Sequence, residues 1–156
     1  MKIKSIKEKP DKLLVTPLGD RLYEVNGTNI WVETDEGCLD FEFKEGFVTN
    51  FRSGGKAVDW LIDQIGDQKK SLCYLLHDAM YTPCEACNGE HPVSREFADE
   101  FLEASLEWAG MWSPTRKLVY GSVRKFGKSA YEEDDKLTEK NKKLFSFKWT
   151  DKKQKK

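Results

Sequence analysis

Residues 39–49 have the sequence LDFEFKEGFVT, which has the pattern of two strands joined by a turn. From Leu39 to Phe43, large apolar side chains alternate with charged ones. Successive side chains of a strand point to opposite faces of a sheet, so this period of two predicts a strand with one buried face. Gly46 then predicts a turn into a further strand at residues 47–49.

The residues upstream of this stretch also have the pattern of strands. Asn26-Gly27 lies between the apolar segments 22–25 and 30–32. Asn-Gly between two such segments is the strongest short-range signal for a β-hairpin. We therefore expect the first fifty residues to form an antiparallel meander.

Downstream, apolar residues recur at helical spacing, and four helices are expected. Glycines, a capping Ser94 and the pair Ser113-Pro114 mark their ends. The expected helices cover residues 57–65, about 68–81, 95 to near 110, and 113–126. Strands followed by helices are typical of an α+β fold, here an N-terminal antiparallel β meander, four helices and a charged C-terminal tail.

Charge dominates the chain beyond residue 128. We expect a single globular domain over residues 1–128 and a charged tail over residues 129–156. Phe145, Phe147 and Trp149 alternate within that tail. Two interpretations stay open, a solvated and frayed tail or a docking segment that adds to a sheet edge.

Composition places the chain among globular proteins. It has 156 residues, of which 34% are charged and 38% hydrophobic, and a net charge of −1, which suits one domain with a heavily solvated surface. No apolar run approaches the ~18 residues that span a bilayer, and the basic start lacks the apolar core of a signal peptide. The four cysteines are expected to be thiols in a reducing cytoplasm. The sequence has no nucleotide-binding glycine loop, nucleophile elbow or nucleic-acid module, so nucleic acid is not an expected partner.

His77 is the centre of the candidate site, because the chain has only two histidines. On the expected helix over residues 68–81, Cys73, His77 and Tyr81 are four residues apart and share one face. Asp78 lies about 100° around the helix from His77. Asp78 is therefore suited to hold a cation or a water, but it is badly placed to orient the imidazole.

The carboxylate that orients His77 is expected to be Asp99. It lies at the border of the apolar face of the third helix, one turn after Arg95, and a carboxylate beside apolar surface is rarely unpaired. If the two helices are antiparallel neighbours, Asp99 accepts one ring N–H of His77 and leaves the other ring nitrogen as a base. Tyr81 is expected to bond to Asp99. A polar cluster of this kind can also be purely structural and set helix register, and residue types alone leave both interpretations open.

A second candidate cluster lies in the loop between the second and third of these helices. Cys84 and Cys87 are spaced as in a zinc knuckle, and His91 follows as a third candidate ligand. One Cys-x-x-Cys pair is only half of a zinc signature, so free thiols in a turn are the alternative.

Arg124 on the fourth helix shares a face with Arg116 and Tyr120, opposite the expected core. A solvated face is the default interpretation. A phosphate or carboxylate site is the alternative, because Arg binds both groups.

Four motifs occur in order along the chain: GFVTNFRS at 46–53, HDAMY at 77–81, REFAD at 95–99 and YGSVRKFG at 120–127. Together they resemble a family of tailed phages and prophages known as domain of unknown function 1353. The resemblance covers roughly residues 45–127. It implies a phage-encoded protein, in the host cytoplasm or the virion, for which the family offers no established activity.

The chain departs from the family pattern at two places. Asn50 stands where the family usually has Asp, and Gly54-Gly55 stands where it has a hydrophobic-Pro pair. If that Asp were a metal ligand or a base, this member would be impaired. The resemblance implies other phage proteins as partners, and the side chains suited to dock them are Phe145, Phe147 and Trp149.

The helix pattern of His77, Asp78 and Tyr81 is also similar to that of the phospholipase A-two class. This similarity implies that His77 activates a water and that Ca²⁺ on Asp78 polarises an ester carbonyl, with carbonyls near Ser53 as further ligands. The leading expectation is therefore a metal-assisted hydrolase that uses His77 and Asp99, with Ca²⁺ or Zn²⁺ as cofactor. The alternative is a non-enzymatic virion or tail-associated protein, or a host-interaction factor, in which the same cluster is structural.

Overall fold

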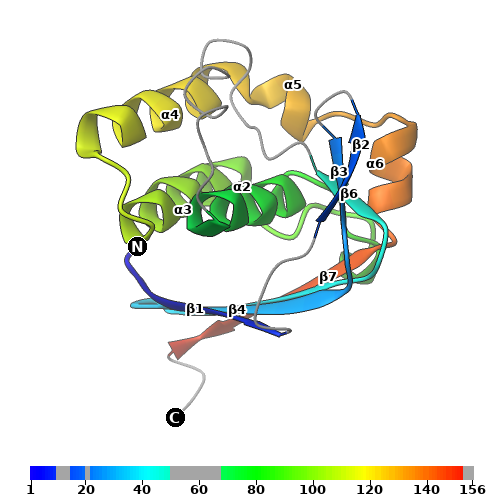
Figure 1. The fold of residues 1–156 in the computed structure, drawn as a ribbon, viewed down its shortest axis with the longest axis horizontal. Helices are drawn as coiled ribbons and strands as arrows, with labels where there is room; N and C mark the ends of the chain where they lie inside the picture. The colour runs from blue at the N-terminus through cyan, green and yellow to red at the C-terminus, as the bar shows by residue number, and fades with distance from the viewer. Residues whose placement is uncertain (10–14, 20–21, 50–67, 153–156) are drawn as a thin grey trace.

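The computed structural model describes residues 1–9, 15–19, 22–49 and 68–152. Strands come first and helices follow, with one more strand near the C-terminus (Figure 1), so the predicted α+β class is confirmed. The strands are β1 (Ile3–Lys9), β2 (Val15–Gly19), β3 (Leu22–Val25), β4 (Thr28–Thr34), β5 (Gly37–Phe43), β6 (Phe47–Thr49) and β7 (Phe145–Asp151). The helices are α2 (Gln68–Met80), the short 3-10 helix η2 (Glu85–Cys87), α3 (Arg95–Trp108), α4 (Ser113–Phe126), α5 (Lys128–Tyr131) and α6 (Lys136–Asn141). The helix expected over residues 57–65, and the candidate residues Asn50 and Ser53, lie outside the described residues.

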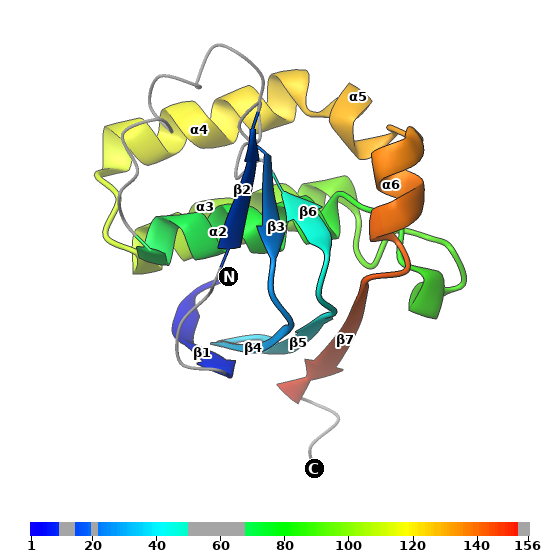
Figure 2. The same cartoon turned by 45° about the vertical axis from the view of Figure 1, so that its right-hand side comes forward.

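The strands form two antiparallel sheets, ordered β1-β4-β5-β7 and β2-β3-β6. Helices α2 and α3 lie over one face of the four-stranded sheet, and α4 lies beyond them (Figure 1). The three-stranded sheet stands at one end of this stack (Figure 1), and its strand β6 lies next to α6 (Figure 2). The layer between sheet and helices is apolar, because each element turns its hydrophobic face inward. Its fully buried side chains include Ile30, Leu39, Phe41, Leu76 and Phe101.

The hairpin predicted at Asn26-Gly27 is not formed, and the expected meander is divided between the two sheets. β3 pairs with β2 and β6, whereas β4 pairs with β1 and β5. A type I′ turn needs positive φ at both central residues, and neither Asn26 nor Gly27 is among the described residues with positive φ. The tight turn lies between β4 and β5, where Thr34 Oγ1 accepts hydrogen bonds from the amides of Glu36 and Gly37. Asn26-Gly27 therefore lies where the chain bends from one sheet into the other.

The C-terminal aromatic segment forms a strand of the chain's own sheet. β7 pairs with β5 along its whole length, and Phe145 lies opposite Phe43. Phe145 is buried, and Phe147 and Trp149 pack against the same core. The spacing predicted pairing with a sheet edge, and that edge belongs to this chain instead of a partner. Residues 145–151 therefore continue the folded domain, which corrects both the expected boundary at residue 128 and the expected docking role of this segment.

The ends of the helices lie close to the predicted positions. Ser94 caps α3 by accepting a hydrogen bond from the amide of Phe97 at 3.1 Å. Ser113 does not cap α4, because it is the first helical residue and Trp112 precedes it at the cap position. None of the described helices is both long enough and apolar enough to cross a membrane.

Candidate functional site

His77 and Asp99 meet between α2 and α3. The Nε2 atom of His77 lies 2.9 Å from Oδ1 of Asp99, and neither side chain has exposed surface. α2 turns His77 toward α3, and Asp99 lies one turn into α3, beside the buried Ala98. The contact is the one expected from the placement of both residues at the borders of apolar helix faces.

Asp99 has three further partners besides His77, namely Tyr81, Arg95 and Arg124. The hydroxyl of Tyr81 donates to Oδ1 of Asp99 at 2.5 Å, and Nη1 of Arg124 donates to Oδ2 at 2.8 Å. Arg95 lies 3.8 Å from Oδ2 and donates to the carbonyls of Val123 and Arg124 at 3.1 Å each. The Asp99 cluster, which we define as His77, Tyr81, Arg95, Asp99 and Arg124, therefore joins α2, α3 and α4.

The charge states of the Asp99 cluster follow from burial and hydrogen bonding. Burial alone would raise the pKa of Asp99, but hydrogen bonds from His77, Tyr81 and Arg124 hold it below its ordinary value. Burial lowers the pKa of His77, and the bond to Asp99 offsets this only in part. At neutral pH the pair is thus a carboxylate and a neutral imidazole whose Nε2–H donates to Asp99. In this tautomer Nδ1 carries the lone pair.

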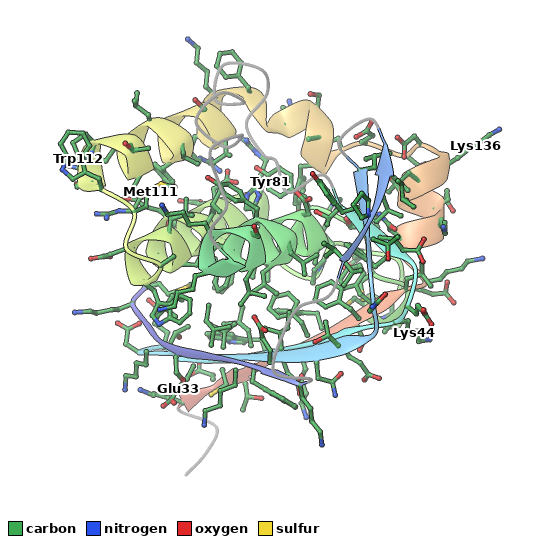
Figure 3. The ribbon with its side chains drawn as sticks, in the orientation of Figure 1. Glu33, Lys44, Tyr81, Met111, Trp112 and Lys136 are labelled. Atoms are coloured by element: carbon green, nitrogen blue, oxygen red, sulfur yellow. The ribbon has the colours of Figure 1, made fainter. Side chains whose placement is uncertain are left out.

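An open cleft of about 140 Å³ lies beside the Asp99 cluster. Tyr81 belongs to both the cleft and the cluster, and Figure 3 shows it between α2 and the layer formed by α4 and α5. Asp78 lines the cleft next to Tyr81 and accepts a hydrogen bond from the hydroxyl of Thr49. His77 is not part of the lining. The remaining lining residues come from β3, β6, the end of α2 and the segment of α5 and α6: Leu22, Phe47, Val48, Thr82, Ala130, Glu133, Asp135, Leu137, Thr138 and Asn141.

Two members of this region were not assigned to the site from the sequence. Arg124 was placed on a face that is solvated by default, and its carboxylate partner depends on how α4 packs on α3. Asn141 lies in a charged stretch, and no local sequence pattern there indicates a functional or buried residue. Its side chain accepts from the amide of Val48 at 3.0 Å and donates to the carbonyl of the same residue at 2.9 Å, which holds α6 against β6 at the cleft wall.

The second candidate cluster does not have the properties of a zinc site. The Sγ of Cys84 is buried and donates to the carbonyl of Phe145. The Nε2–H of His91 donates to the backbone carbonyl of Tyr131 at 2.6 Å, and the imidazole stacks on the ring of Tyr131. Burial and the neighbouring Cys84 raise the pKa of the Cys87 thiol to about 12. Over the described ranges of the chain, no three His, Cys, Asp or Glu side chains form a group that could hold a metal ion, at these residues or at Asp78.

Gly127 lies against the hydroxyl of Tyr81, where an added side chain would have no room. Its φ of −79° is ordinary, but a Cβ added there would lie 2.6 Å from Tyr81 Oη and in collision with the carbonyl of Val123. Gly127→Ala is expected to lower the free energy of unfolding by about 1–3 kcal/mol, because overpacking a filled site costs this much. Urea denaturation followed by fluorescence measures the effect.

Gly121→Ala is the matched control for this prediction. Gly121 lies on the same helix, and a Cβ added there meets nothing within 4 Å, so Ala should stabilise α4 by about 1 kcal/mol. In a Tyr81→Phe background, which lacks the hydroxyl, Gly127→Ala should cost less than in the wild type. An equal cost in both backgrounds would show that Gly127 does not serve the contact between Tyr81 and Asp99.

Comparison with known proteins identifies a family without assigning a function. A family model described as a protein of unknown function (DUF1353) matches residues 27–123, which is more than half of the chain. That range includes Asp99, His77, Tyr81 and Arg95. No curated protein and no solved structure matches the chain.

Proposed function

The chain belongs to DUF1353, a family of proteins of unknown function, and we propose that it is a hydrolase whose proton acceptor is His77. The observation that carries this proposal is the 2.9 Å contact between His77 Nε2 and the buried carboxylate of Asp99. An imidazole held in one tautomer by a carboxylate is the arrangement that general bases use in many hydrolases. The adjoining cleft, lined by Asp78 and Tyr81, is the place where a substrate would bind.

The proposed reaction uses only groups of this chain and water. A water attacks the carbonyl carbon of an ester and gives one proton to Nδ1 of His77. Asp99 stabilises the imidazolium that forms, and Tyr81 and Arg124 keep Asp99 ionised. The imidazolium then returns the proton to the leaving oxygen, which restores the neutral ring. Since His77 itself is buried, the water and the ester group must reach it from the cleft past Tyr81.

The cation that the sequence similarity implied is not part of this mechanism. The carboxylate of Asp78 bonds to Thr49, and the portion of the chain described by the structure supplies no further acidic or histidine ligands at Asp78 that would complete a metal site. Asn50 and Ser53 stay predictions as supporting residues, because both lie outside the described residues.

His77→Gln is the variant that tests the proposed hydrolase. Gln can keep an N–H donor near the position of His77 Nε2, so it retains the bond to Asp99 while removing the base. Hydrolysis should fall by about 10²–10⁴-fold, the usual contribution of a general base, with the thermal transition nearly unchanged. The measurement is the release of acid from a panel of carboxylic esters with short and long acyl chains.

His91→Gln serves as the control, because His91 is the other histidine of the chain. Within the described residues, His91 donates a hydrogen bond to the carbonyl of Tyr131 and stacks on the ring of the same residue. It should keep the activity of the wild type. A panel on which the wild type is no faster than His77→Gln would rule out His77 as the base.

A second candidate is a non-enzymatic role, and the complete burial of the His77 side chain favours it. In this case the Asp99 cluster only fixes the register of α2, α3 and α4. The protein would then act as a component of a phage particle or as a host-interaction factor, in line with the sequence resemblance. His77→Gln separates the two candidates by activity, because only the first one predicts that the variant loses hydrolysis while it stays folded.

A further inference from the structure

The outer side of α4 exposes an unusual number of large apolar side chains. Among the described residues, five such side chains are exposed, and three of them belong to α4 or its cap. Trp112 is 73% exposed, Leu118 59% and Phe126 51%. Figure 3 shows Trp112 at the outer end of α4, pointing away from the rest of the molecule. Scattered single apolar residues need no explanation, but three on one helix indicate a surface with a function.

The exposed surface of α4 and of the start of α5 also carries positive charge. Residues 112–131 contain five Lys and Arg residues and no Asp or Glu. Two of the five point inward, because Arg116 donates to the carbonyl of Met111 and Arg124 to Asp99. The three lysines are exposed, and Lys125 lies over the ring of Phe126, with Nζ 5.3 Å from the ring centroid. We define the α4 face by its exposed apolar and basic side chains: Trp112, Lys117, Leu118, Lys125, Phe126 and Lys128.

One side of α4 is occupied by the core. Val119 and Val123 are fully buried against α2 and α3, so packing within the domain does not explain the exposed side chains. Leu118 and Lys125 are seven residues apart, which places them on one side of the helix, whereas Phe126 follows Val119 by seven residues and lies at the border of the core side. Helix α4 therefore packs one side into the core and leaves apolar and basic side chains exposed around the rest of its surface.

We propose that the α4 face binds the surface of an anionic lipid bilayer. The lysine ammonium groups would meet the headgroup phosphates, while Trp112, Leu118 and Phe126 enter the interface between headgroups and acyl chains. A helix rich in lysine that also exposes Trp, Leu and Phe is typical of helices that lie in the plane of a bilayer surface. Tryptophan prefers this interface because its ring is apolar and its N–H is polar.

Charge argues against a second copy of the chain as the occupant. A symmetric contact through the α4 face would bring the lysines of both copies together, and like charges at close range oppose association. An anionic bilayer instead offers negative charge and hydrocarbon together. It also needs no shaped groove, which suits the convex surface of a single helix.

The test is binding of the full chain to vesicles in a sedimentation assay. Vesicles of phosphatidylcholine alone and of phosphatidylcholine with phosphatidylglycerol are compared at low and high salt. The wild type should bind the anionic vesicles, bind the neutral ones far less, and be released by salt. Replacing Lys117, Lys125 and Lys128 by Gln should reduce binding by about fivefold for each lysine.

The apolar contribution is tested by replacing Trp112, Leu118 and Phe126 with Ser. This triple variant should bind anionic vesicles about tenfold more weakly or worse, because the apolar area that enters the bilayer is lost. All three side chains are exposed, so the domain should keep its thermal transition. If this variant unfolds, the lysine variants still decide the question.

Two control variants carry the same kinds of change elsewhere on the surface. Leu18→Ser with Trp31→Ser removes the other two exposed apolar side chains, and the second control replaces three exposed lysines by Gln at Lys136, Lys140 and Lys143. Both should bind as the wild type does. The proposal fails if the wild type does not bind anionic vesicles, or if the controls lose as much as the α4 variants. It also fails if sizing shows a soluble dimer that the triple variant dissociates, since the occupant is then a second copy.

Discussion

Asp99→Ala is expected to destabilise the fold by about 3–5 kcal/mol, because removing one partner of a buried, charge-paired group leaves the others unsatisfied. Asp99 accepts hydrogen bonds from His77, Tyr81 and Arg124, and its side chain has no exposed surface. The substitution would leave a guanidinium without its anion and two buried donors without an acceptor. The shift of the denaturant midpoint measures the effect.

Two further variants, Asp99→Asn and Glu100→Ala, test whether the loss of stability comes from the charge and hydrogen bonds of Asp99. Asn keeps one acceptor oxygen for His77 or Tyr81 but no charge for Arg124, so the cost should fall to about 1–3 kcal/mol. Glu100 is the next residue on α3 and is exposed, and its replacement by Ala should change stability by less than about 0.5 kcal/mol. If Asp99→Ala behaves like Glu100→Ala, the Asp99 cluster does not stabilise the contact of α2, α3 and α4.

The pH dependence of stability provides a second measure of the same carboxylate. The pKa of Asp99 is lower in the folded chain than in the unfolded one, so its stabilisation is fully present above its ordinary value of 3.8. That stabilisation should be lost as the pH falls through the lower, folded value. Asp99→Asn, which does not titrate, should lack this part of the acid loss.

Truncation after Ser129 is expected to abolish the cooperative folding transition. The deletion removes β7, which pairs with every residue of β5, and it removes Phe145 from the core. It also removes Tyr131, whose ring contacts Tyr81 with the centroids 5.2 Å apart. Losing one large buried aromatic costs about 3–5 kcal/mol, and the whole stability of such a domain is about 5–15 kcal/mol. Thermal melting followed by circular dichroism measures the result.

Removal of residues 153–156 alone is the control for this truncation. It shortens the same end of the chain and leaves all of β7 in place. The melting temperature should therefore equal that of the wild type. If the chain truncated after Ser129 still melts cooperatively, the globular domain ends near residue 128, as the sequence predicted.

The sequence predicted the parts of the fold that depend on local periodicity. Alternation from Leu39 to Phe43 and helical spacing around His77 correspond to β5 and α2. The same spacing placed His77 and Asp99 at facing helix borders. These features depend on which side of an element is apolar, and local sequence contains that information.

The features that the sequence did not predict depend on contacts between distant segments. Asn26-Gly27 has the local signal of a hairpin, but strand pairing with β2 and β6 overrides it. The spacing of Phe145 and Trp149 indicates a strand without identifying its neighbour. Arg124 binds Asp99 because α4 packs on α3, and no local pattern on α4 indicates a buried anion.

Asn141 has a consequence for how separate copies of the chain can interact. A strand at the edge of a sheet leaves backbone groups that can pair with a strand of another molecule, which leads to strand exchange or aggregation. On β6, the amide and carbonyl of Val48 are both bonded to the Asn141 side chain. The primary amide thus takes the place of a neighbouring peptide group, and it closes this edge with one residue of α6 in place of a whole strand. A chain with Asn141→Ala would present an unprotected edge at β6 to every other copy in solution.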